Sequence, residues 1–299
     1  MKMVKGLILA LFLALLVEPL AVASAAKDRS TSSTMKVNFY SNALQKKMHL
    51  NVYLPPNYEA QRNYPVLYVL HSYKLNEDHW WNNLKITEKA DELIASGKIE
   101  PLIIVAPMID NSFGVNSAEL TGTVPESGKP EDEGVLYKGK YEDYITQDVV
   151  NYVDTHFKTI KSRSSRYLGG TSMGGFAALH IGFSHPELYG KVGGHSPALF
   201  VGPMWDVLEK LIYPTEAVRK KNDPILLAGT QKLNKQRIYL DMGDKDDFLG
   251  PLKTLDQVLA KRPTKSYELH VNPGGKHDDA YWSSQMENYL LFYAGFDQD

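Results

Sequence analysis

The sequence contains no cysteine among its 299 residues. Disulfide bonds, thiol catalysis, cysteine-ligated metal sites and lipid attachment to a cysteine are therefore excluded, and the folded state has to be stabilised by burial of an apolar core. The chain also lacks a strong excess of charge, because 33 basic and 35 acidic residues leave a formal net charge of −2. This balance leaves no excess of positive charge for binding nucleic acid or an anionic membrane, so we expect neither as a partner.

The apolar run near the N-terminus is too short for a comfortable membrane span, which needs about 20 residues. Lys2 and Lys5 form a basic start, Gly6 to Leu16 is apolar, and Ala23-Ser24-Ala25 offers small residues for cleavage. This order predicts a cleaved signal peptide over residues 1–25, with a retained N-terminal anchor as the alternative. We accordingly expect a secreted or periplasmic protein that is not inserted in a membrane after cleavage.

The remaining chain suits one large domain, at 35–299 after a polar leader at 26–34, and contains no internal repeats or low-complexity tracts. Alternating polarity and continuous apolar runs predict strands, whereas helical spacing of apolar residues predicts helices. The predicted strands are 35–41, 47–54, 64–70, 101–108, 166–169, 191–199, 237–242 and 266–271, and the predicted helices are 86–95, 141–157, 252–259 and 281–293. This alternation indicates an α/β fold with a mostly parallel central sheet and helices on both faces.

Two segments do not follow the alternation. Residues 109–140 are polar, contain glycine and proline, and are long for a plain connection, so we expect the rim or lid of an active site there. The pattern over 200–236 is weak, although Met204, Trp205, Leu208 and Leu211 are consistent with a helix that lines a cleft.

A G-x-S-x-G pattern formed by Gly170, Ser172 and Gly174 joins a short strand to a helix. Such a turn projects the serine hydroxyl from a strained backbone at the head of a helix. Glycines flank the serine because side chains there would block the turn. The pattern alone recurs by chance in roughly one chain of this length in ten, but the strand before it and the small residues after it are the context that it requires. We predict a catalytic serine; the alternative is an ordinary glycine-rich turn.

A serine hydroxyl becomes a good nucleophile when an imidazole accepts its proton and a carboxylate orients that imidazole. Two later loops follow strands in the expected chain order, first an acidic turn and then a glycine turn with His277. In the acidic turn we favour Asp246, since its spacing puts the carboxylate just past the sheet edge; Asp247 and then Asp244 are the alternatives. His277 is the predicted base.

The other histidines fit the role of base less well. His180 lies on the serine's own helix, where we expect it to pack or to cap; His185 precedes a proline at a helix end, and His195 follows a strand with no acid nearby. Asp278 and Asp279 follow the predicted base, but no second histidine stands at ligand spacing, so we expect no metal and no cofactor.

The oxyanion of an acyl-transfer intermediate needs two backbone donors, one from the residue after the nucleophile and one from the loop after the third strand. The first is the amide of Met173. The second loop is His71-Ser72-Tyr73-Lys74, in which the amide of Tyr73 is the natural donor. We interpret His71 as a structural residue at the strand end.

Several segments carry a resemblance that covers about Val37 to Tyr293. They are Val52-Tyr53-Leu54-Pro55, Tyr64-Pro65-Val66-Leu67-Tyr68-Val69-Leu70-His71, Asp78-His79-Trp80-Trp81, Gly170-Thr171-Ser172-Met173-Gly174-Gly175, His185-Pro186-Glu187-Leu188-Tyr189, Gly243-Asp244-Lys245-Asp246, and Gly275-Lys276-His277-Asp278-Asp279-Ala280-Tyr281-Trp282. In this order they resemble the esterase D family of α/β-hydrolases, which includes feruloyl and acetyl esterases, S-formylglutathione hydrolases and mycolyltransferases.

The resemblance implies an α/β-hydrolase fold, a triad of Ser172, Asp246 and His277, and the amides of Tyr73 and Met173 as oxyanion donors. One departure concerns the oxyanion loop, because the family usually has glycine where this chain has a serine at position 72. That difference leaves the amide in place but removes the backbone freedom that glycine would give the loop.

The leading hypothesis is a secreted carboxylesterase that forms an acyl-enzyme on its serine and acts on acetyl, feruloyl or short-chain esters, either small molecules or esters linked to polysaccharide. Trp80, Trp81, Trp205 and Trp282 are candidate contacts for an aromatic or sugar group, and packing is the equal alternative for each. The competing hypotheses are an acyltransferase of the mycolyltransferase type and a non-catalytic secreted protein that binds carbohydrate or another partner, which only the altered oxyanion loop supports.

Overall fold

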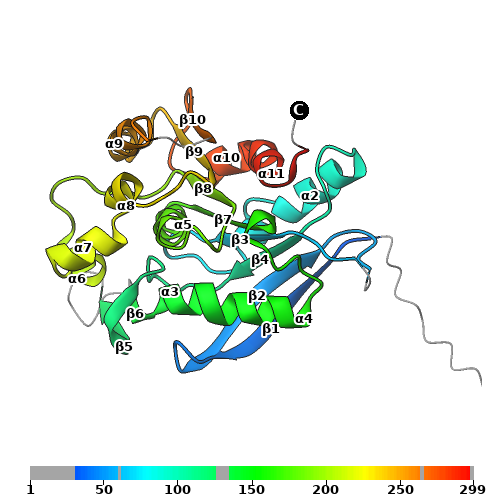
Figure 1. The fold of residues 1–299 in the computed structure, drawn as a ribbon, viewed down its shortest axis with the longest axis horizontal. Helices are drawn as coiled ribbons and strands as arrows, with labels where there is room; N and C mark the ends of the chain where they lie inside the picture. The colour runs from blue at the N-terminus through cyan, green and yellow to red at the C-terminus, as the bar shows by residue number, and fades with distance from the viewer. Residues whose placement is uncertain (1–30, 60–61, 126–134, 263–265, 297–299) are drawn as a thin grey trace, which may run out of the picture.

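A computed structural model describes residues 31–59, 62–125, 135–262 and 266–296. The predicted signal peptide and most of the predicted leader lie outside the described residues. Among the described residues, the central feature is an eight-stranded sheet with the order β1-β2-β4-β3-β7-β8-β9-β10 (Figure 1). Its strands are β1 (Ser33–Ser41), β2 (Lys46–Leu54), β3 (Val66–Leu70), β4 (Ile103–Pro107), β7 (Arg166–Thr171), β8 (Lys191–His195), β9 (Arg237–Gly243) and β10 (Ser266–Asn272).

The pairings confirm the predicted mostly parallel sheet. β1 pairs antiparallel with β2, and β2 pairs antiparallel with β4, whereas every pair from β4 to β10 is parallel. The continuous apolar run of β3 places it at the centre of the sheet, where all five of its residues are buried. Parallel strands send their carboxyl ends to one edge of the sheet, so the loops after β3, β7, β9 and β10 meet there.

Helices cover both faces of this sheet, as predicted. The helices are α1 (His79–Asn82), α2 (Ile86–Ala95), α3 (Tyr141–Asp143), η1 (Tyr144–Val149), α4 (Val150–His156), η2 (Arg163–Ser165), α5 (Met173–Ser184), α6 (Asp206–Ile212), α7 (Glu216–Asn222), α8 (Pro224–Thr230), α9 (Leu249–Leu259), α10 (Asp279–Ser284) and α11 (Met286–Ala294). One apolar cluster joins a face of the sheet to α4, α5, α8 and α9, and the other joins the opposite face to α1, α2, α10 and α11 (Figure 1). Side chains of β3 alternate between the two clusters, which is the period of a strand.

The polar segment 109–140, predicted as a rim or lid, contains an antiparallel pair of strands, β5 (Asn116–Pro125) and β6 (Val135–Lys140), which the sequence did not indicate. Two sequence-based expectations need correction. The strand expected over 191–199 ends at His195, since Ser196 adopts a φ of 43° that no strand accommodates. The predicted helix at 281–293 is interrupted at Gln285, so that α10 and α11 are separate helices.

Candidate active site

The turn between β7 and α5 holds Ser172 in a strained backbone conformation. Its φ of 55° and ψ of −115° lie outside the regions that non-glycine residues favour. A Cβ atom on Gly170 would overlap the backbone of Gly174, and a Cβ atom on Gly174 would overlap the carbonyl of Leu70. Glycine at both positions is therefore what allows the strand, the turn and the helix to approach this closely.

Ser172, His277 and Asp246 form one hydrogen-bonded chain. Nε2 of His277 lies 2.7 Å from Oγ of Ser172, and Nδ1 of His277 lies 2.8 Å from Oδ2 of Asp246. The Asp246 side chain is fully buried, and its other oxygen accepts the amide hydrogen of Phe248 at 2.9 Å. Because a carboxylate only accepts, Nδ1 of His277 carries the hydrogen, which leaves Nε2 able to accept the serine proton.

The acidic turn offers three carboxylates, and Asp246 is the one that contacts the imidazole. Asp244 accepts the amide hydrogen of Gly274 at 2.8 Å, and Asp247 is exposed. β9 and β10 pair in parallel, so that the two loops leave the sheet side by side, and the amide of Asp244 donates to the carbonyl of Asn272 at 3.0 Å. Asp244 therefore braces the two loops against each other.

The histidines on and after the serine's helix lie away from the nucleophile. His180 is buried in α5, and its Nε2 is 3.2 Å from Oε2 of Glu142; His185 contacts Oε1 of the same carboxylate at 2.7 Å. The hydrogen bond with Glu142 raises the pKa of His185 despite partial burial, which alone would lower it. We read both as part of the packing of α5 against α3.

A second Asp–His pair lies beneath the serine turn, which corrects the expectation that His195 has no acid nearby. Nδ1 of His195 is 2.8 Å from Oδ1 of Asp241, and both side chains are fully buried. The hydroxyls of Tyr281 and Tyr289 donate to Oδ2 of Asp241, each at 2.8 Å, and Tyr293 Oη lies 3.1 Å from Nε2 of His195. The sequence signal for this pair was an acid inside the apolar strand β9.

The backbone of His195 and Asp241, called the inner pair below, supports the turn that holds Ser172. The carbonyl of His195 accepts the amide hydrogen of Ser172 at 3.0 Å, and the carbonyl of Asp241 accepts that of Ser196 at 2.8 Å. A Cβ atom on Gly193 would overlap the hydroxyl of Tyr293, so this glycine makes room for the buried phenol.

The loop after β3 carries the predicted second oxyanion donor, Tyr73. The amides on either side are engaged, since the Ser72 amide faces Nδ1 of His79 at 3.4 Å and the Lys74 amide donates to Oδ1 of Asn111 at 2.8 Å. Met173 is the first residue of α5, where backbone amides have no acceptor within the helix. Both predicted donors thus belong to segments that border the serine, and their role in catalysis remains a prediction.

Serine at position 72 is compatible with this loop. The positive φ in the loop falls at Lys74 and not at Ser72, so residue 72 does not need the conformational freedom of glycine. Oγ of Ser72 lies 2.8 Å from Oγ1 of Thr171, which ties the loop to the end of β7. His71 supports the same loop: its Nε2 accepts the amide hydrogen of Ile109 at 3.0 Å, and its Nδ1 donates to the carbonyl of Ser72 at 2.9 Å. Burial lowers the pKa of His71 to about 4, consistent with a neutral structural residue.

A cavity of about 560 Å³ opens over Ser172 and His277. Most of its wall is aromatic or aliphatic, and the apolar lining consists of Tyr73, Leu75, Phe113, Met173, Ala198, Phe200, Trp205, Leu208, Phe248 and Trp282. Trp205 and Trp282, predicted as contacts, are among them. The phenylalanines were not identified from the sequence, because each comes from a loop whose direction no periodicity specifies.

Trp80 and Trp81 do not line this cavity, so their prediction as substrate contacts is corrected. Trp80 is 1% exposed, and its Nε1 donates to the carbonyl of Leu70 at 3.0 Å. Trp81 packs against the apolar cluster that contains Trp80 and side chains of α2, α10 and α11. Trp80 therefore belongs to the core, whereas Trp81 is half-buried at its margin.

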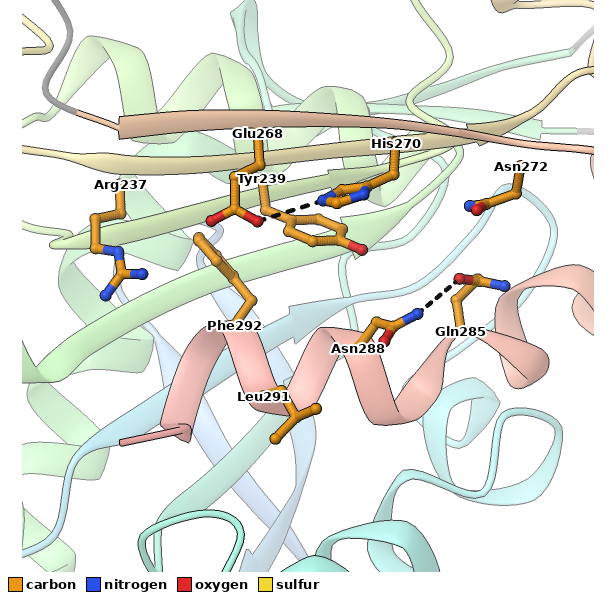
Figure 2. A pocket seen from close by; sticks show the side chains of 9 residues that line it. All are labelled: Arg237, Tyr239, Glu268, His270, Asn272, Gln285, Asn288, Leu291 and Phe292. Atoms are coloured by element: carbon orange, nitrogen blue, oxygen red, sulfur yellow. Dashed lines mark hydrogen bonds and ion pairs between the residues drawn. The ribbon is translucent and has the colours of Figure 1, made fainter. Parts of the chain in front are cut away.

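Another cavity, of about 310 Å³, lies at the outer edge of the sheet. Figure 2 shows side chains of β9, β10 and α11 around it, with Glu268 and His270 on the strand side and Asn288 on the helix side. Nε2 of His270 is 3.3 Å from Oε2 of Glu268. None of its nine described lining residues is a serine, so no serine–histidine pair faces this cavity.

The described part of the chain holds neither a cluster of metal-ligand side chains nor a helix of membrane-spanning character. No group of three or more histidine, aspartate or glutamate side chains there could hold a metal ion. Within the same residues, no helix combines the length and the apolar character of a membrane span.

Comparison with known proteins identifies the family. A model of the putative esterase family matches residues 41–293. The endo-1,4-beta-xylanase/feruloyl esterase of Xylanibacter ruminicola is 26% identical over 266 residues, which are 87% of this chain; the chain spans only 31% of the length of that relative.

Solved structures share the fold. A ferulic acid esterase superposes with a TM-score of 0.73 at 24% identity, covering 88% of this chain and 97% of the other. An S-formylglutathione hydrolase from Agrobacterium tumefaciens gives a TM-score of 0.71 at 19% identity, covering 88% and 95%. These likenesses confirm the predicted α/β-hydrolase fold. The match of the family model over residues 41–293 confirms the family that the sequence motifs predicted: the chain belongs to the putative esterase family.

Proposed function

We propose that the protein is a secreted serine carboxylesterase in which Ser172 is the nucleophile, His277 the general base and Asp246 the residue that orients the base. The observation that carries the proposal is the unbroken hydrogen-bonded chain of these three side chains, with both contacts at or below 2.8 Å, at the floor of an apolar cavity. A serine, histidine and aspartate in this chain order and geometry are the machinery of acyl transfer through an acyl-enzyme.

The reaction then has two halves. Oγ of Ser172 attacks the ester carbonyl while Nε2 of His277 takes the serine proton, and the negative charge on the carbonyl oxygen is stabilised by the amides of Met173 and Tyr73. His277 returns the proton to the departing alcohol, which leaves the acyl group on Ser172. Water enters, His277 accepts one of its protons, and the hydroxide released attacks the acyl carbonyl. Breakdown of this second intermediate frees the acid and returns the proton to Ser172.

The cavity favours an aromatic acyl group over acetate. Phe113, Phe200, Phe248 and Trp205 provide apolar surface close to Ser172, and a space of about 560 Å³ greatly exceeds the size of an acetyl group. A relative that carries feruloyl esterase in its name points the same way. Trp205 is 37% exposed, so an alcohol portion, soluble or attached to a polysaccharide, has a path to solvent beside it.

Secretion is part of the proposal because the basic, apolar and small-residue order of residues 1–25 is that of a signal peptide. The substrate is then an extracellular ester. The non-catalytic alternative rested on the altered oxyanion loop, and the fit of Ser72 in that loop removes its support. The acyltransferase alternative differs only in the acceptor of the second half-reaction.

A panel of esters tests the proposal. Residues 26–299 and the Ser172→Ala variant are assayed on methyl ferulate and on p-nitrophenyl acetate, butyrate and octanoate. We expect methyl ferulate to have the highest kcat/KM and the variant to lose kcat by about 10⁴-fold or more. If the variant turns over at the wild-type rate, or if the wild type hydrolyses none of the esters, the serine esterase proposal fails. The same assay with an added alcohol tests the acyltransferase alternative. If the alcohol captures a larger share of the acyl group than its concentration relative to water would give, the acyltransferase is favoured.

A further inference from the structure

His79, the first residue of α1, connects two loops of the candidate site. Its side chain is fully buried, with Nδ1 3.4 Å from the amide nitrogen of Ser72 and Nε2 2.8 Å from Oδ1 of Asp279. An amide nitrogen only donates and a carboxylate only accepts, so Nδ1 is the acceptor and Nε2 carries the hydrogen. The two neighbours thus select a single tautomer of the imidazole.

Both neighbours of His79 line the cavity over the nucleophile. Ser72 immediately precedes Tyr73, whose amide is the proposed oxyanion donor. Asp279 follows His277 by two residues and is the first residue of α10. One buried side chain therefore joins the loop that would stabilise the oxyanion to the loop that carries the base.

The surroundings of Asp279 and His79 hold this connection in place. Oδ2 of Asp279 accepts a hydrogen bond from Nδ2 of Asn83 at 2.6 Å, so both carboxylate oxygens of Asp279 are hydrogen-bonded. The ring of Trp282 meets His79 edge-on, with centroids 6.1 Å apart, and meets His277 edge-on at 5.1 Å. Burial lowers the pKa of His79 although Asp279 opposes the shift, and a neutral ring is what an acceptor at Nδ1 requires.

We propose that His79 is a positioning residue for the oxyanion loop: it accepts the Ser72 amide hydrogen and thereby fixes the peptide that leads to Tyr73, while its bond to Asp279 ties this loop to that of His277. The inference rests on the serine esterase function proposed above. Oxyanion donors have to be aimed at the place where charge develops, and a misplacement of about 1 Å can cost roughly 100-fold in rate.

Two substitutions separate the two contacts of His79. The carbonyl oxygen of asparagine in His79→Asn occupies the position of Nδ1 and can accept from Ser72, whereas the amide group of glutamine in His79→Gln reaches the position of Nε2 and can donate to Asp279. His180→Asn is the matched control, because His180 is equally buried, also contacts a carboxylate, and lies outside the cavity lining.

Kinetics on methyl ferulate give the first readout. We expect His79→Gln to lower kcat by about 10- to 100-fold with little change in KM, since the acyl group still binds while the oxyanion loop is no longer fixed. His79→Asn should retain more of the wild-type kcat than His79→Gln. His180→Asn should lower the thermal midpoint without lowering kcat.

An oxyanion-dependent inhibitor gives the readout that a purely structural role would not change. An aryl trifluoromethyl ketone adds to the serine and develops an oxyanion, whereas ferulate binds without one. Affinity for the ketone should fall in His79→Gln in parallel with kcat/KM, and affinity for ferulate should not. If His79→Gln fails to fold, Asp279→Asn replaces it, with a smaller loss of kcat and ketone affinity in the same pattern.

The outcomes keep the two proposals apart. Wild-type kcat and ketone affinity in folded His79→Gln, or an equal loss in His180→Asn, would overturn the positioning role and leave the esterase standing. A wild-type enzyme without turnover that depends on Ser172 would instead overturn the esterase and this inference with it.

Discussion

The structure contains two Asp–His pairs in which Nδ1 of the histidine contacts the carboxylate and Nε2 contacts a hydroxyl group. Both lie at the same sheet, one at the end of its strands and the other beneath it. In the outer set, Asp246 and His277 face Ser172; in the inner set, Asp241 and His195 face Tyr293. The carboxylate–imidazole distance is 2.8 Å in both. The carboxylate–imidazole contact alone therefore does not separate a candidate catalytic set from a structural one.

The environment of each hydroxyl separates them. Ser172 and His277 line a cavity of about 560 Å³, whereas the inner histidine and aspartate are fully buried and contact no described cavity. Asp241 receives three donors, from His195, Tyr281 and Tyr289, so the inner set is saturated with hydrogen bonds. Burial holds the pKa of Tyr293 well above its usual range, which keeps the phenol protonated. We therefore expect the access of a substrate carbonyl, and not the presence of the pair, to decide which hydroxyl reacts.

Replacing the two hydroxyls should break the comparison most strongly. Ser172→Ala should reduce kcat on methyl ferulate by about 10⁴- to 10⁶-fold without lowering the thermal midpoint, since the nucleophile is lost and the fold is not. Tyr293→Phe should leave kcat of the folded enzyme unchanged and lower the free energy of unfolding by about 1 kcal/mol, the usual value of a buried hydrogen bond. A large loss of kcat in Tyr293→Phe at an unchanged midpoint would show that the inner set takes part in the chemistry.

Replacing the carboxylates of Asp246 and Asp241 should have the next largest effects. Asp246→Asn should lower kcat by about 10³- to 10⁴-fold, because the carboxamide no longer holds the imidazole in the tautomer that accepts a proton at Nε2. Asp241→Asn should instead destabilise the fold by about 3 kcal/mol, since an amide NH₂ would then face donors that need an acceptor. Steady-state kinetics and urea unfolding of both variants distinguish the effects, and similar profiles for the two variants would contradict the distinction.

The contact between Glu142 and His185 extends the comparison to the dependence of stability on pH. Burial raises the pKa of Glu142, but hydrogen bonds from His180 and His185 outweigh it and hold that pKa well below its usual range, while the pKa of His185 is raised. The contribution of Glu142 to the free energy of unfolding is fully present above about pH 4.5, and it is lost as the pH falls through the lowered pKa of Glu142 in the folded state. The contribution of His185 is fully present below about pH 6.5, and it is lost as the pH rises through the raised pKa of His185 in the folded state.

The contact should therefore contribute most between about pH 4.5 and 6.5. We expect Glu142→Gln to be less stable than the wild type by about 1 kcal/mol in urea unfolding within this window, with a smaller difference on either side. Its kcat in the folded state should equal that of the wild type. A stability difference that does not vary with pH would mean that the contact is not an ion pair.

Much of the fold followed from local patterns in the sequence. The helix predicted over 86–95 coincides with α2, and the apolar run of β3 indicated a strand covered on both faces. The region 200–236 was harder, because α6, α7 and α8 are each only seven residues long and show no long periodic face. Thr215 accepts from the amide of Val218, and Asp223 accepts from the amide of Ile225, so the available signals were caps and a proline after the aspartate.

The candidate site could be predicted where chain order and loop position specify it, as for Ser172, Asp246 and His277. Prediction failed for Trp80, since the sequence does not say which face of a sheet a four-residue helix covers. The inner pair was missed because His195 and Asp241 are 46 residues apart and meet only through the pairing of β8 with β9. Contacts between neighbouring parallel strands depend on sheet order, which local patterns do not contain.

The central claim is that the outer hydroxyl, and not the inner one, carries the acyl group. Acid-quenched reactions with methyl ferulate, digested and analysed by mass spectrometry, test it directly, with the slowed His277→Gln variant as a control. The account predicts one feruloyl group on the peptide that contains Ser172, present in the wild type and absent in Ser172→Ala. A feruloyl group on another peptide, or turnover in Ser172→Ala equal to that of the wild type, would contradict it.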